Sequence, residues 1–142
     1  MKKLLVFLFL IQSFVGFSQT IKKKLSDKKI FNLICENTMK VDLTNSDTSY
    51  YIFCAFQNMN YSQIIDLGSV YINSRYSLDK TINELKECLK YMDEKSISYS
   101  IGSFQIYDFS NNLYINDKSK YTTLTKKHVL TWIEWLESCI VK

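Results

Sequence analysis

Two stretches of the chain carry apolar residues at helical spacing. In the first, apolar positions recur every three or four residues opposite a charged face: Leu78, Ile82, Leu85, Leu89 and Met92. The second, near the C-terminus, repeats this spacing: Val129, Ile133, Leu136 and Ile140. A surface helix uses such a stripe to cover one side of a sheet. We therefore expect two amphipathic helices, capped at their N-termini by Ser77 and Thr125.

Most of the remaining chain alternates between apolar and polar residues, as β-strands do. The expected strands cover residues 39–43, 50–56, 64–72, 97–106, 113–116 and 121–124. Short segments rich in Asn, Asp and Ser separate them and are typical of turns. The alternation changes parity after Gly102, which favours a β-bulge there. Residues 26–37 begin with a capping serine and a cluster of apolar residues, and they predict a short helix.

These elements predict an α+β fold. We expect a single antiparallel sheet of five or six strands, with the two amphipathic helices packed on one face and the short N-terminal helix beside them. A weak internal similarity links residues 49–52 to 98–101 and residues 71–73 to 114–116. It would fit a β-β-β-α pseudo-repeat, although chance is the simpler explanation in a chain rich in Tyr, Ile and Asn.

The N-terminus has the three parts of a secretory signal peptide. Two lysines precede the apolar run of residues 4–11, and Gly16 and Ser18 supply the small residues before a cleavage site at Gln19. A membrane span needs about 20 apolar residues, so this run is too short to be an anchor. We expect residues 1–18 to be removed. The mature protein would then lie, without a transmembrane anchor, in the periplasm or extracellular space of a Gram-negative bacterium.

The mature chain, residues 19–142, is long enough for one α+β domain with its own core but not for two. The signal carries two lysines, so the net charge falls from +4 to +2 on cleavage. Arg75 is the single arginine, whereas proteins that bind nucleic acid favour that side chain. A nucleic-acid partner is therefore not expected.

Four cysteines remain after cleavage: Cys35, Cys54, Cys88 and Cys139. In an oxidising compartment an even number permits two, one or no disulfides, and four cysteines allow three complete pairings. All four lie among apolar residues, as free buried thiols also do. The pairing stays open at this point.

The sequence contains little that could carry catalysis. His128 is the single histidine, and the chain has no Cys-x-x-Cys pair and no glycine-rich phosphate loop. Cys139 would lie about 16 Å from His128 along a helix, too far for a nucleophile–base pair. Residues 42–47 and 108–117 combine acidic and amide side chains, but neither segment follows calcium-loop spacing. We expect no cofactor, no metal and no enzymatic activity.

Two sets of residues are candidates for binding a partner. His128, Trp132 and Trp135 follow one flank of the last helix, and exposed tryptophans are favoured as interface anchors; packing within the protein is the alternative. The second set consists of tyrosines in the expected strands, which would form an aromatic platform if they share an uncovered face: Tyr51, Tyr71, Tyr99, Tyr107 and Tyr114.

The hypothesis favoured by these features is an exported, non-catalytic binding protein. Its partner would be a protein of the cell envelope, as for a periplasmic inhibitor or immunity-type protein, an analogy of form alone. A carbohydrate- or envelope-binding domain is the second interpretation. A small hydrolase is the third, and the single histidine argues against it.

Overall fold

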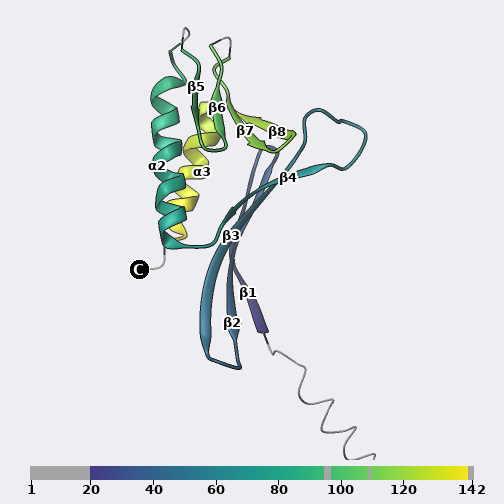
Figure 1. Ribbon diagram of the computed structural model, residues 1–142, viewed down its shortest axis with the longest axis vertical. Helices are drawn as coiled ribbons and strands as arrows, with labels where there is room; N and C mark the ends of the chain where they lie inside the picture. Colours follow the sequence, from purple (N-terminus) through teal and green to yellow (C-terminus); the bar gives the residue numbers. More distant parts are fainter. Residues whose placement is uncertain (1–19, 95–96, 109, 141–142) are drawn as a thin grey trace, which may run out of the picture.

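The computed structural model describes residues 20–94, 97–108 and 110–140. The predicted signal peptide, residues 1–18, lies outside this part of the chain. The described residues form two four-stranded antiparallel sheets, and each sheet is followed by one helix (Figure 1).

The first sheet, sheet A, contains β1 (Thr20–Ile30), β2 (Leu33–Asp42), β3 (Asp47–Gln57) and β4 (Leu67–Ile72), paired in chain order. Its first three strands are long and extend beyond the helices (Figure 1). Cys35 and Cys54 lie directly opposite each other on β2 and β3 and form a disulfide. Cys88 and Cys139 are free thiols.

The second sheet, sheet B, contains β5 (Tyr99–Ile101), β6 (Phe104–Ile106), β7 (Leu113–Asp117) and β8 (Lys120–Leu124), also paired in chain order. Buried and partly exposed positions alternate along β7 and β8, so one face of this sheet is buried and the other is partly exposed. The two sheets meet beside β8, where the Met59 N–H donates a hydrogen bond to the Tyr121 carbonyl (2.9 Å).

The two amphipathic stripes form α2 (Arg75–Tyr91) and α3 (Lys126–Ser138). A capping box begins α2: the Ser74 side chain accepts from the Ser77 N–H, and the Ser77 hydroxyl accepts from the Ser74 N–H (both 3.1 Å). The cap is therefore Ser74 and not Ser77. Thr125 occupies the expected N-cap position of α3, but its side chain makes no capping hydrogen bond.

One apolar core lies between the helices and the inner faces of both sheets. The helices pack against each other; α2 also contacts β5 and β6, and α3 contacts β1 and β8 (Figure 1). The core includes the disulfide of sheet A, the buried residues of sheet B, and Trp132 of α3. Among the residues that the structure describes, no helix lies against the outer face of sheet A (Figure 1).

The predicted single sheet of five or six strands is wrong. Whether two strands join one sheet depends on contacts between segments that are distant in sequence. Here α2 separates the first four strands from the last four along the chain, and each group of four forms its own sheet. The β-β-β-α repeat is wrong as well, because four strands precede each helix. The two weak sequence similarities also join non-equivalent strands: residues 49–52 lie in β3, whereas residues 99–101 form β5.

The predicted short helix over residues 26–37 is also wrong, because this segment ends β1, turns and begins β2. Ile30 pairs with Leu33 across a two-residue turn in which Phe31 has a positive φ of 53°. Apolar residues at 30, 31, 33 and 34 satisfy helical spacing. In the structure Leu33, Cys35 and Asn37 are buried while Ile34 and Glu36 between them are exposed, as in a strand.

Two smaller expectations change in a similar way. The parity change at Gly102 marks a tight hairpin between β5 and β6 and not a bulge, and Gly102 adopts a positive φ of 57° there. The strand expected to begin at residue 64 begins at Leu67, so Ile64 and Ile65 belong to a loop.

Candidate functional site

The helix flank proposed from the sequence does not form a surface. Trp132 is fully buried and meets the Phe104 ring edge-on, with ring centroids 6.0 Å apart. Trp135 is also buried. His128 is half-buried and stacks on Phe31, with centroids 5.2 Å apart and planes 7° from parallel. Packing within the protein accounts for both tryptophans, so a partner has no access to them in this fold.

The five candidate tyrosines separate into three places. Tyr51 and Tyr71 lie together on the outer face of sheet A, with ring centroids 5.8 Å apart. Tyr107 and Tyr114 meet edge-on at 4.8 Å on sheet B, where Tyr121 extends the row. Tyr99 instead stacks against a residue of α2, Tyr91. A common platform of all five does not exist, and only the first pair lies on the long, helix-free face.

That outer face carries a group of exposed large apolar side chains, each 42% to 58% exposed. We name it the apolar patch, and it consists of Ile34, Phe53, Leu67 and Tyr71. Its members come from three neighbouring strands, and Phe53 lies directly opposite Tyr71. Large apolar side chains that gather on one exposed face are a feature of interaction sites. Ile34, Phe53 and Leu67 were not among the candidates predicted from the sequence. Ile34 and Phe53 are the chain neighbours of the buried Cys35 and Cys54, so strand alternation places them on the other face of the sheet.

The free edge of β4 is protected by side chains from sheet B. The backbone N–H of Ser69 donates to the Asp117 carboxylate (2.9 Å), and the Lys120 ammonium donates to the Leu67 carbonyl (2.8 Å). An unprotected edge would be open to pairing with a strand of another chain. Because these two groups are occupied, strand addition is disfavoured at this edge.

The opposite edge, formed by β1, is protected in a different way. Five lysines lie along this strand, and its pairing with β2 is irregular between Lys24 and Ser26. Lysines and bulges are devices that natural sheets use to prevent edge-to-edge association. Both edges of sheet A are therefore protected, whereas its outer face is open to solvent.

The loop of residues 58–66 extends this surface and is held by hydrogen bonds at its base. Asn58 is fully buried; its N–H donates to the Asp66 carbonyl (2.7 Å) and its side-chain amide donates to the Asp66 carboxylate (2.8 Å). The Gln57 amide also donates to the Ile64 carbonyl (2.9 Å). These hydrogen bonds hold the two ends of the loop together.

The same loop exposes several apolar side chains: Met59, Tyr61, Ile64 and Ile65. Ile64 and Ile65 come just before Leu67 of the patch in the chain. Ile65 is 87% exposed, so packing within the protein gives no reason for an isoleucine at this position. A loop that carries apolar residues on a rigid base is suited to recognition, because little conformational entropy is lost on binding.

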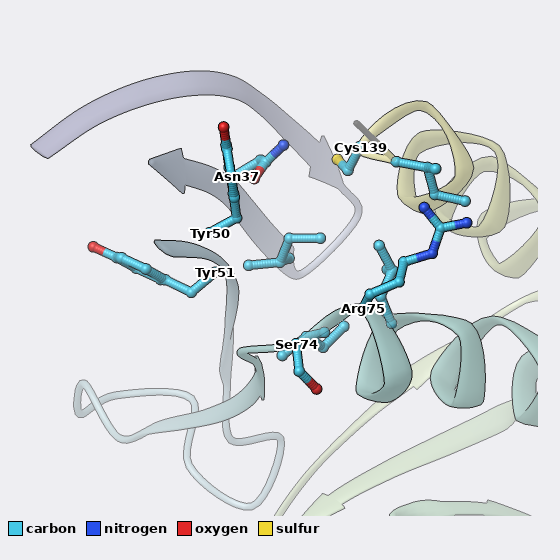
Figure 2. A pocket seen from close by; sticks show the side chains of 10 residues that line it. Asn37, Tyr50, Tyr51, Ser74, Arg75 and Cys139 are labelled. Atoms are coloured by element: carbon cyan, nitrogen blue, oxygen red, sulfur yellow. The ribbon is translucent and has the colours of Figure 1, made fainter. Parts of the chain in front are cut away.

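A separate groove, with a volume of about 210 Å³, lies on the inner side of sheet A. Figure 2 shows Tyr50 and Tyr51 from β3 on one side, with Arg75 at the start of α2 and Cys139 at the end of α3 on the other. The Cys139 thiol is buried beside the Ser26 hydroxyl, with the sulfur and oxygen 3.8 Å apart.

This groove lacks the features of a nucleophilic site. Burial raises the pKa of Cys139, so its thiolate is disfavoured at neutral pH. Burial, with the charges of Glu84 and Glu87, raises the pKa of the other free thiol, Cys88, to about 12. Arg75 is already bound to the Asp79 carboxylate (2.9 Å).

Within residues 20–94, 97–108 and 110–140, no group of three or more His, Cys, Asp or Glu side chains could hold a metal ion. No helix in the same residues is both long enough and apolar enough to cross a bilayer.

Comparison with known proteins gives no family assignment: no family model matches the chain, and no curated protein or solved structure is significantly similar to it.

Proposed function

We propose that this chain is an exported, non-catalytic binding protein whose apolar patch holds a protein partner in the cell envelope. The observation that carries the proposal is the patch itself: four large apolar side chains together on the helix-free outer face of sheet A. A protein partner that covers this face would remove their apolar surface from water, which favours association. The protected edges favour docking on the face over strand addition.

The neighbouring loop supports an inhibitor or immunity-type role. Such a protein must hold its target firmly with a small surface, and preorganisation raises affinity without added area. The loop of residues 58–66 is fixed by Asn58 and Gln57 and continues the patch from Leu67. A partner with a concave apolar surface would accept Ile64 and Ile65 while the patch covers the adjoining area.

Export is supported by the signal-like pattern of residues 1–18 and by the disulfide between Cys35 and Cys54. Disulfides persist in the periplasm and outside the cell but are rare in the cytosol. Mass spectrometry of the protein isolated from its own host should find an N-terminus at Gln19 and the disulfide intact. A retained signal sequence on reduced, cytosolic protein would contradict this part of the proposal.

The test of the proposed interface compares two double variants. Phe53→Ser/Tyr71→Ser removes the centre of the patch, whereas Leu130→Ser/Tyr76→Ser removes matched apolar groups exposed on the helices; Phe53 and Leu130 are 42% and 45% exposed. Each tagged protein is expressed in the host, and companions are recovered from washed envelope fractions. Thermal unfolding of both variants establishes that they remain folded.

We expect one stoichiometric protein to accompany the wild type and the helix variant and to be lost with the patch variant. Equal recovery with both variants would refute the patch as the interface. Recovery of no stoichiometric protein with the wild type would refute the function itself.

A carbohydrate-binding role is the second candidate, and the row of Tyr107, Tyr114 and Tyr121 on sheet B favours it. Aromatic faces suit sugar recognition because they combine apolar area with a polar tip. In a glycan-binding screen, this alternative predicts affinity that is lost in Tyr114→Ala and kept in Phe53→Ser/Tyr71→Ser.

A further inference from the structure

A hollow of about 380 Å³ opens on the outer face of sheet A, between the apolar patch and the tip of the β2–β3 hairpin. Its walls include Lys22 of β1, Lys40 of β2, Ser49 and Tyr51 of β3, and Tyr71 and Asn73 at the end of β4. The strand register places the first three of these residues side by side in one row. The hollow therefore has a cationic side and an aromatic side.

The cationic side is built from two lysines that face each other directly across β1 and β2. Like charges directly opposite on one face of a sheet repel each other. Within the described part of the chain, neither Lys22 nor Lys40 lies within ion-pair distance of a carboxylate. By contrast, the next outer-face lysine of β1, Lys24, is bound to Asp27 (2.8 Å) and lies 3.9 Å from Glu36.

Two carboxylates lie near the lysine pair without pairing with it. Asp42 and Asp47 face each other one row closer to the hairpin tip, which is about 7 Å along the strands. Because these carboxylates repel an anion, its favourable position is on the other side of the hollow, near Tyr51 and Tyr71. Hydroxyl and amide donors also lie on that side, from Ser49 and Asn73.

We propose that this hollow binds an acidic side chain, Asp or Glu, of the protein partner that covers the apolar patch. A carboxylate there would accept charge-assisted hydrogen bonds from Lys22 and Lys40 and relieve their mutual repulsion. The inference rests on the proposed function, because Tyr71 belongs to both the hollow and the patch. That continuity favours a protein over an anionic polysaccharide, since a single partner must present apolar and acidic groups side by side.

The test is a titration of the purified, isotope-labelled protein, followed by the NMR shifts of its backbone amides. The probe is the blocked peptide acetyl-Leu-Glu-Glu-Leu-amide at millimolar concentrations, and acetyl-Leu-Gln-Gln-Leu-amide is the neutral control. We expect saturable shifts at Lys40, Ser49 and Asn73 with the acidic peptide alone. Added salt should weaken them, because exposed charges are screened.

Two charge-reversed variants separate this site from general electrostatic attraction. Lys22→Glu/Lys40→Glu should weaken binding of the acidic peptide by at least about tenfold. The matched control, Lys23→Glu/Lys28→Glu, makes the same change in net charge on the other face of sheet A and should leave the affinity essentially unchanged.

Equal weakening by both variants, or no saturable shifts with the acidic peptide, would overturn the assignment. Saturable shifts with oligogalacturonate but none with the peptide would also overturn it and would identify an anionic glycan as the ligand. These outcomes are independent of the envelope experiment. If the patch variant loses its partner there and the acidic peptide fails here, the inference is wrong and the proposed function stands.

Discussion

Gly68 provides a quantitative test of the packing that supports the outer face. It lies in β4 directly opposite Phe56 of β3, and a Cβ added to Gly68 would lie 2.4 Å from two carbon atoms of the Phe56 ring. Phe56 is 1% exposed, so the ring cannot move into solvent. Overpacking of this kind destabilises by about 1–3 kcal/mol, and we expect Gly68→Ala to lie in the upper half of that range.

The sign of the result is informative. Where the native backbone suits alanine and space is free, Gly→Ala stabilises by about 0.4–1 kcal/mol, because the unfolded chain loses entropy. The contact between the new methyl group and the Phe56 ring must therefore cost more than this entropic gain if Gly68→Ala is to be destabilising. Urea unfolding, followed by the fluorescence of the buried Trp132 and Trp135, gives the free energy of unfolding for each variant.

Phe56→Leu supplies the control, because it removes the ring that the new methyl group would meet. The shorter side chain is itself destabilising, since it leaves a cavity. In that background Gly68→Ala should lose most of its penalty, so the two substitutions should be strongly non-additive. A stabilising Gly68→Ala in the wild type, or the same loss in both backgrounds, would show that β3 and β4 do not pack as described.

Two further predictions concern stability. Replacing both Cys35 and Cys54 by alanine should lower the free energy of unfolding by about 3 kcal/mol, because their disulfide closes a loop with a sequence separation of 19; unchanged urea midpoints would argue against the bond. The hydrogen bond from Asn58 and the ion pair with Lys120 lower the pKa of Asp66. The stability they provide is therefore complete above about pH 4 and lost as the pH falls through the lowered folded-state pKa. Unfolding measured between neutral and acidic pH should show a shallower decline for Asp66→Asn, and identical pH profiles would contradict this assignment.

The parts of the fold that could be predicted are those with a strong local period. The stripe from Leu78 to Met92 has one interpretation as a helix, and the structure has α2 there. The segment from Ile30 to Cys35 satisfies both helical and strand spacing. Pairing with other strands decides between them: Ile30 pairs with Leu33 across a turn, and Leu33 to Cys35 pair with β3, about 20 residues further along the chain.

The division into two sheets could not be predicted from the same patterns. Alternation shows which residues share a face of one strand, but it does not show which strand edge meets which. The protection of β4 by Asp117 and Lys120 illustrates this, because these residues lie about 50 positions away from the backbone groups that they bind.

For the candidate site, the sequence identified Tyr51 and Tyr71 correctly as strand tyrosines but could not determine which face they share. For Trp135, which lies off the apolar stripe, the sequence left both packing within the protein and exposure at an interface open. The side chain is buried, because α3 contacts a helix and strands of both sheets. The exposure of Phe53 and Ile34 follows from alternation only once the buried face is known.

In the proposed function, a protein partner covers the outer face of sheet A. The most direct measurement places a photo-crosslinking amino acid at position 53 in the patch, or at position 130 on α3, in protein expressed in its host. After irradiation, we expect a single adduct of defined mass from position 53 in the envelope fraction and none from position 130. Adducts from both positions, or from position 130 alone, would contradict it.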